Sequence, residues 1–77
     1  MIYNRVATLR AELGLSRQDL AEKVGVNYQT IGFIERGDYS PSLELAFSIA
    51  ETFGVTLTDI FSDKPFKPLF GPKEGES

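Results

Sequence analysis

The sequence contains no cysteine and no histidine among its 77 residues. Without cysteine, neither disulfides nor thiolate-bound metals can staple the fold. The two absences together remove most protein metal sites and most nucleophile–base pairs of enzymes, so we expect no metal, no cofactor and no catalysis. Long apolar runs are also missing, since none approaches the roughly 20 residues that cross a membrane. The N-terminus lacks the hydrophobic core of a signal peptide, so we expect a soluble cytoplasmic protein.

Positive charge is scarce, and it is unevenly spread along the chain. Eight Lys and Arg stand against 11 Asp and Glu, a net charge of −3. Residues 1–37 hold five basic and four acidic residues, a net +1, whereas residues 38–77 hold three and seven, a net −4. Local potential near phosphate matters more than the total, so an acidic second half does not exclude nucleic-acid binding by the first.

Helical periodicity and helix-ending residues predict five short helices in one domain. They cover residues 4–13, 17–24, 28–36, 41–53 and 57–61. Ser16 and Asn27 suit the N-cap positions of the second and third helices, and Gly14 and Gly25 suit the ends of the first and second. Residues 62–64 can form a strand that pairs with residues 2–4, limited to an edge by Pro65. We therefore expect an all-α bundle with a small pairing between the terminal strands.

The organisation follows from the same reading. Residues 1–61 are assigned to the helical domain, residues 62–70 to a C-terminal extension that holds the strand and dimer contacts, and residues 71–77 to a disordered tail. A single helical domain of this length is marginally stable, which favours support from a second subunit.

The second and third predicted helices contain the pattern that points to function. Ala21 is small where the third helix would cross the second, and Gly25 supplies the positive φ of a tight turn between them. Ile31 and Ile34 would bury the near side of the third helix. Two short helices joined in this way meet at a steep angle, and the second projects from the body as a helix that fits the major groove of DNA.

A helical wheel of the third helix separates its inner and outer faces. At 100° per residue, Ile31 and Ile34 define the inner direction. The outward set consists of Gln29, Gly32, Phe33 and Arg36, with Tyr28 and Thr30 at its flanks. Glu35 falls close to the inner side and needs a partner there. Glutamine can hydrogen-bond adenine with both ends of its amide, so Gln29 is a candidate base reader, although it can equally be a solvated surface residue.

The chain resembles the phage-repressor/Cro-type helix-turn-helix regulators, also called the xenobiotic-response-element family. The segments that carry the likeness are Thr8-Leu9-Arg10, Gly14-Leu15-Ser16, Gln18-Asp19-Leu20-Ala21, Gly25-Val26-Asn27, residues 31–37, Pro41-Ser42-Leu43, Ile49-Ala50 and Phe53-Gly54-Val55. The likeness runs from about residue 6 to residue 61 and is greatest to small prokaryotic dimeric repressors of the cytolysin-repressor type. It implies a five-helix fold and sequence-specific control of transcription, most often repression.

The resemblance also implies roles for particular residues. Gln18 would anchor the second helix on a phosphate, Gln29 and Thr30 would contact bases, and Arg10 would pair with Glu35. The loop 38–42 would approach the DNA backbone. The full set assigned to DNA contact is Arg17, Gln18, Asn27, Tyr28, Gln29, Thr30, Gly32, Phe33, Arg36, Tyr39 and Ser40. Arg17, Gly32 and Phe33 depart from the usual family pattern, and Phe33 either packs on a neighbour or meets a thymine methyl.

The expected partners are double-stranded DNA with a pseudo-palindromic operator and a second copy of the chain. One recognition helix reads few base pairs, whereas a two-fold dimer reads two half-sites about 34 Å apart. Surplus apolar residues in the second half suggest an interface around Phe47, Leu57, Phe61 and Phe66. Two alternatives stay open: an antitoxin-like protein whose C-terminal extension silences a toxin, and an adaptor that uses the same fold to bind protein, which the acidic total charge favours.

Overall fold

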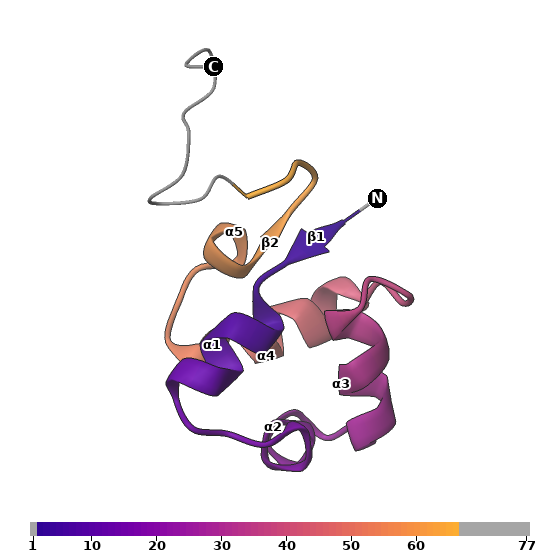
Figure 1. The fold of residues 1–77 in the computed structure, drawn as a ribbon, viewed down its shortest axis with the longest axis vertical. Helices are drawn as coiled ribbons and strands as arrows, with labels where there is room; N and C mark the ends of the chain where they lie inside the picture. Colours follow the sequence, from indigo (N-terminus) through magenta and orange to yellow (C-terminus); the bar gives the residue numbers. More distant parts are fainter. Residues whose placement is uncertain (1, 67–77) are drawn as a thin grey trace.

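The computed structural model describes residues 2–66, in which five helices are followed and preceded by the strands of a small sheet (Figure 1). In chain order the elements are β1 (Tyr3–Asn4), α1 (Val6–Glu12), α2 (Arg17–Val24), α3 (Tyr28–Glu35), α4 (Leu43–Phe53), α5 (Leu57–Ile60) and β2 (Phe61–Ser62). The predicted all-α class with a terminal strand pairing is confirmed. Residues 67–70 of the proposed extension and the proposed tail 71–77 lie outside the described residues.

Polar caps and one glycine fix the two helices of the predicted motif. The Ser16 hydroxyl accepts from the Asp19 N–H (2.9 Å), and Asp19 Oδ2 accepts from the Ser16 N–H (3.0 Å), a capping box that begins α2. Gly25 ends α2 with φ of +76°, a conformation that costs glycine nothing. Asn27, two residues after Gly25, is the N-cap of α3, and its Oδ1 accepts from the Gln29 N–H (2.8 Å). The turn between the helices is therefore short and well defined.

The two terminal strands pair antiparallel, with Tyr3 opposite Ser62 and Asn4 opposite Phe61. Figure 1 shows them side by side, with β2 following directly from α5. The second strand begins at Phe61, one residue before the predicted range. Phe61 has an extended backbone (φ −124°, ψ 143°), pairs with Asn4 and keeps its ring in the core at 8% exposure.

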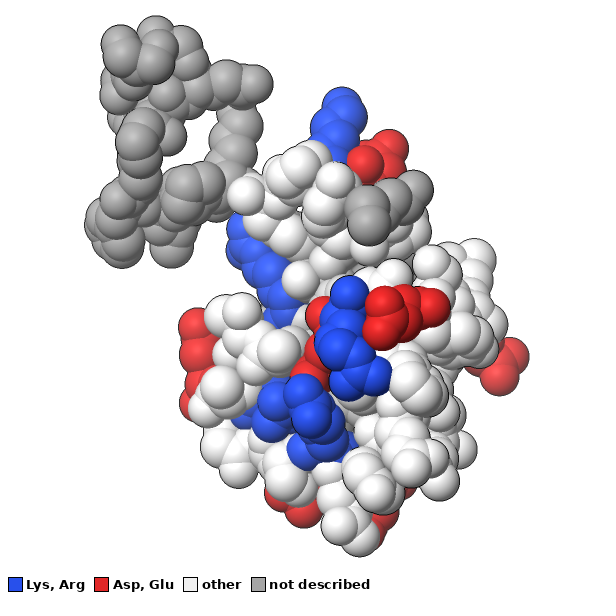
Figure 2. All heavy atoms as spheres, turned by 45° about the vertical axis from the view of Figure 1, so that its right-hand side comes forward, with Lys and Arg blue, Asp and Glu red and all other residues white. Residues whose placement is uncertain are grey.

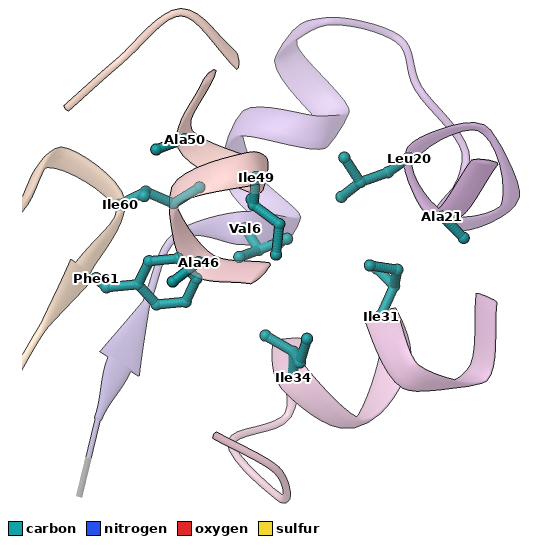
Figure 3. Close-up of a cluster of buried hydrophobic side chains, with 10 residues drawn as sticks. All are labelled: Val6, Leu20, Ala21, Ile31, Ile34, Ala46, Ile49, Ala50, Ile60 and Phe61. Carbon is teal, nitrogen blue, oxygen red and sulfur yellow. The ribbon is translucent and has the colours of Figure 1, made fainter. Parts of the chain in front are cut away.

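One apolar cluster holds all five helices together (Figure 3). Its fully buried side chains are Val6, Leu20, Ile31, Ile34, Ile49 and Ile60. In Figure 3, Ile31 and Ile34 of α3 face Leu20 of α2 and Ile49 of α4. Burying a side chain of this kind stabilises a fold by about 1.5–3 kcal/mol relative to leaving it exposed. The inner face of α3 is therefore committed to the core, as the wheel predicts.

Two leucines near helix ends are exposed. Leu13 is 56% exposed and directly follows α1, which ends at Glu12. Leu43 is 67% exposed as the first residue of α4, directly after the Ser42 cap. Leu45, two residues further along α4, packs against the core. Apolar residues at the ends of these helices are therefore not all part of the core.

Candidate DNA-binding surface

α3 lies along one edge of the molecule, where its outer face is free (Figure 1). It packs on α2 and α1, and α2 also packs on α4. The side chains of Tyr28, Gln29 and Phe33 are exposed, with Tyr28 at 52% and Phe33 at 46%. Thr30 is half-buried at the flank. An exposed tyrosine, glutamine and phenylalanine on one helix form a surface that can hydrogen-bond base edges and make apolar contacts with them.

Gly32 differs from its predicted outward exposure, because it is buried in the structure. The side chains that cover it are arginines. A Cβ built on residue 32 would lie 3.3 Å from Nη1 of Arg36 and 3.9 Å from Nε of Arg17. The wheel angle of residue 32 is outward, but a wheel does not show long side chains that fold back over a neighbour. The surface above Gly32 is thus made of guanidinium groups.

Glu35 is the only acid among the described residues that is nearly buried, with a side chain 3% exposed. Its Oε2 accepts from Nε of Arg10 (2.7 Å), which confirms the predicted pair between α1 and α3. Its Oε1 accepts from Nε of Arg17 (2.9 Å), an ion pair that the sequence did not reveal. Arg10 also donates to the Leu15 carbonyl (2.9 Å), so it ties three segments together.

Arg17, which is assigned to DNA contact, is half-exposed and also bound within the protein. The side chain is 48% exposed although its Nε is bound to Glu35. A guanidinium has five donors, so one bond to Glu35 leaves others available for DNA. Gln18, the next residue along α2, is exposed, as a phosphate anchor requires.

Asn4 is a structural link to α3 that sequence reasoning missed. Its Nδ2 donates to the Ile34 carbonyl (2.8 Å), and its Oδ1 accepts from the Val6 N–H (3.0 Å). One half-buried side chain thereby joins β1, the start of α1 and the last turn of α3. An asparagine just before a helix suggests the cap on Val6, but nothing in the sequence indicates the contact 30 residues away.

The loop after α3 continues the same face. Asp38 Oδ2 accepts from Nε of Arg36 (3.2 Å), and both side chains are more than half exposed. Tyr39 is 50% exposed and Ser40 is exposed too, as expected of residues that approach a DNA backbone. Figure 2, which brings the α3 side forward, shows basic side chains gathered in the middle of this face with a few acids beside them. Such a local cluster is the part of the charge that a phosphate would meet.

The residues proposed for the dimer interface fall in three environments. Phe47 is 49% exposed, and Leu57 is half-buried against the core. The expectation that Phe61 lies on the interface conflicts with its burial in its own subunit's core. Phe66 is half-buried, with the guanidinium carbon of Arg5 4.1 Å from its ring centroid.

The helices of residues 2–66 are all too short to be candidates for a membrane-spanning segment.

Two curated relatives show what the chain is similar to. It is 53% identical over 58 residues to an uncharacterised HTH-type transcriptional regulator of Methanocaldococcus jannaschii, covering 75% of this chain and 88% of that protein. It is 32% identical over 63 residues to the cryptic phage CTXphi transcriptional repressor RstR of Vibrio cholerae, covering 82% of this chain and 57% of RstR.

The fold has a solved counterpart in the restriction-modification controller protein C.AhdI of Aeromonas hydrophila. The TM-score is 0.68 at 29% identity, over 71% of this chain and 83% of that one. Residues 6–60, most of the chain, match the family model described as helix-turn-helix. The match spans the α2–α3 pair, the outer face of α3 and the core beneath it. The chain therefore belongs to the helix-turn-helix family of Cro/repressor-type transcriptional regulators, which are DNA-binding proteins and not enzymes.

Proposed function

We propose that the protein is a transcriptional repressor that binds a pseudo-palindromic operator as a homodimer, with α3 in the major groove. The observation that carries the proposal is the division of α3 into two faces. Ile31 and Ile34 are fully committed to the core, whereas Gln29 on the opposite face is exposed. The nearly buried Glu35 carboxylate, bound by Arg10 and Arg17, links this helix to α1 and α2.

The name of one relative favours repression over activation. The RstR protein of Vibrio cholerae is named a transcriptional repressor, and it shares 32% identity with most of this chain. A bound protein whose only described domain recognises DNA represses by occupying a site that the transcription machinery needs. The acidic second half of the chain repels the phosphates of DNA, and this repulsion keeps the non-specific affinity low.

The test of the function is selection of bound duplexes from a random pool with the full chain. A two-fold symmetric sequence with half-sites about 34 Å apart is the expected result. Duplex binding should weaken as salt rises, because phosphate contacts release counterions. A chain that selects no sequence and shows no salt-dependent duplex binding would favour the adaptor function instead.

The first prediction separates base reading from phosphate anchoring with two matched variants. Gln29→Ala should cost about 1–3 kcal/mol on the selected operator and relax one base position, since it removes a base contact. Gln18→Ala, an exposed glutamine on α2, should weaken selected and random duplexes alike. Fluorescence anisotropy on both duplexes measures the difference. Equal losses on both duplexes for Gln29→Ala would make it a positioning residue only.

A further inference from the structure

The guanidinium of Arg36 lies over the middle of α3, one turn before its own position. Its central carbon is 5.0 Å from the centroid of the Phe33 ring, within the range of a cation–π contact. Its Nη1 is 3.3 Å from the point where residue 32 would carry a Cβ. The guanidinium of Arg36 therefore packs on the ring of Phe33 and occupies space that the absence of a side chain at Gly32 leaves open.

This position follows from helix geometry. Side chains on a helix lean toward its N-terminus, so a residue at the C-cap covers the preceding turn. Most side chains at residue 32 would fill the same space. Glycine is a poor helix former with an ordinary helical φ here, so no turn or cap explains its presence in the interior of α3. The close approach of Arg36 fits a residue that has no side chain.

Two arginines lie around Gly32, and each is bound to an acid through its Nε. Arg17 lies farther from the point where residue 32 would carry a Cβ, with Nε and Cδ at 3.9 and 4.0 Å, and its Nε is bound to Glu35, which also binds Arg10. Asp38 accepts only from Nε of Arg36. Among residues 2–66, neither terminal amino group of Arg36 donates a hydrogen bond, and the side chain is 51% exposed. Its two terminal amino groups are thus available together.

We infer that Arg36, seated on Phe33 and Gly32, reads a guanine in the major groove and determines specificity for the C-terminal half of α3. The planar fork of a guanidinium matches the O6 and N7 acceptors of guanine, and the cation–π contact and the Asp38 bond hold that fork in one orientation. The inference rests on the proposed function, because it requires α3 to lie in the major groove. It replaces Gly32 and Phe33 as base readers with the arginine that they support.

The experiment compares the parent with Arg36→Ala and Arg36→Lys by selection from the random pool and by anisotropy on the selected operator. The parent should require a guanine at one position in each half-site. Arg36→Ala should lose that preference, a change of about 5- to 150-fold between guanine and the other bases. Arg36→Lys keeps the charge without the fork and should recover only part of it. Replacing that guanine by 7-deazaguanine, which lacks N7, should weaken the parent and leave Arg36→Ala unchanged.

Variants at Gly32 test the seat. Gly32→Gln puts a better helix former in the place of the guanidinium, so its thermal midpoint should not fall while the guanine preference is lost. Gly32→Ala, whose methyl group needs a shift of only a few tenths of an ångström in Arg36, should keep most of the preference. Circular dichroism melts confirm that each variant is folded.

Three outcomes would overturn the inference. If Arg36→Ala weakens all duplexes equally and lowers the salt slope by about one, Arg36 contacts a phosphate. If it selects the same sequence as the parent, Arg36 reads no base. If Gly32→Gln keeps the guanine preference, the seat is not needed. A parent that selects no sequence at all refutes the proposed function itself, which distinguishes that failure from a failure of Arg36 alone.

Discussion

Glu35 forms ion pairs with arginines of two other helices. Its carboxylate is nearly buried, and it accepts from Arg10 of α1 and Arg17 of α2. An acid this deep is stable only because both oxygens are bonded to guanidinium groups. The pair of Arg36 and Asp38, two residues later, is exposed at both ends. The two pairs of Glu35 and the pair of Arg36 and Asp38 have similar chemistry and differ chiefly in the burial of the carboxylate, so burial decides what each contributes.

The second prediction uses this difference. Glu35→Gln should destabilise the protein by about 3–5 kcal/mol, because it leaves the partly buried Arg10 and its neighbour Arg17 without a counter-charge. Asp38→Asn, the matched exposed control, should change stability by about 1 kcal/mol or less. Urea unfolding followed by circular dichroism gives both values. Similar midpoints for parent and Glu35→Gln would mean that the pair holds α3 to the body only weakly.

Residue positions could be predicted from the sequence where periodicity or resemblance constrained them. The wheel placed Glu35 near the core, and the family likeness supplied Arg10 as its partner. The burial of Gly32 and the bond between Arg17 and Glu35 were not predicted for one physical reason, which is that a long arginine side chain contacts residues far from its own backbone. Asn4 was missed because its partner, the Ile34 carbonyl, is a backbone atom with no trace in the sequence.

At the scale of elements, the second, third and fifth helices begin at the predicted residues, whereas the first and fourth begin two residues later than predicted. Ser16 and Asn27 cap the helices that they were predicted to cap. The hydroxyl oxygen of Ser16 and the amide oxygen of Asn27 each accept from a backbone N–H that has no partner within its helix. The second strand begins at Phe61, inside the predicted fifth helix, where the chain pairs with Asn4 of the N-terminal strand. Tertiary packing is absent from a local reading, so the shift was not predictable.

The third prediction concerns the capping boxes of α2 and α5. The backbone N–H and hydroxyl of Ser16 lower the pKa of Asp19, and the hydroxyl and N–H of Thr56 lower that of Asp59. A carboxyl whose pKa is lower in the folded state stabilises the fold above its unfolded pKa, near 3.9, and this contribution disappears as pH falls through the lower folded value. Asp19→Asn should therefore melt below the parent at pH 6, and the gap should shrink below about pH 4.

The control for this prediction is Glu22→Gln, an exposed acid of α2 outside the capping box. Its melting difference from the parent should not follow the same course with pH. Asp59→Asn should repeat the behaviour of Asp19→Asn at the other box. A gap between Asp19→Asn and the parent that is as large at pH 3 as at pH 6 would show that the carboxylate charge does not contribute through the cap.

At the scale of the whole molecule, the chain has two surfaces with different character. Ile31 and Ile34 join α3 to the core, and its opposite face carries Gln29 and Arg36. α4 packs on α5, and α4 exposes Phe47. A dimer that uses α4 and α5 keeps both recognition helices free. This arrangement is what a two-fold operator requires.

The last prediction is that Phe47→Asp weakens the homodimer while the subunit stays folded. Phe47 is 49% exposed, so a carboxylate there meets water in the monomer but would be buried against the partner in the proposed interface. Leu13→Asp is the matched control, because Leu13 is similarly exposed, at 56%, after α1. Sedimentation equilibrium at micromolar concentration should give a dimer for the parent and for Leu13→Asp, and mostly the 8.5 kDa monomer for Phe47→Asp.

Phe61→Asp is unsuitable for this test, because its buried ring makes unfolding the expected result. A parent that is monomeric both free and on its operator contradicts the dimer, whereas a Phe47→Asp protein that remains dimeric moves the interface away from α4.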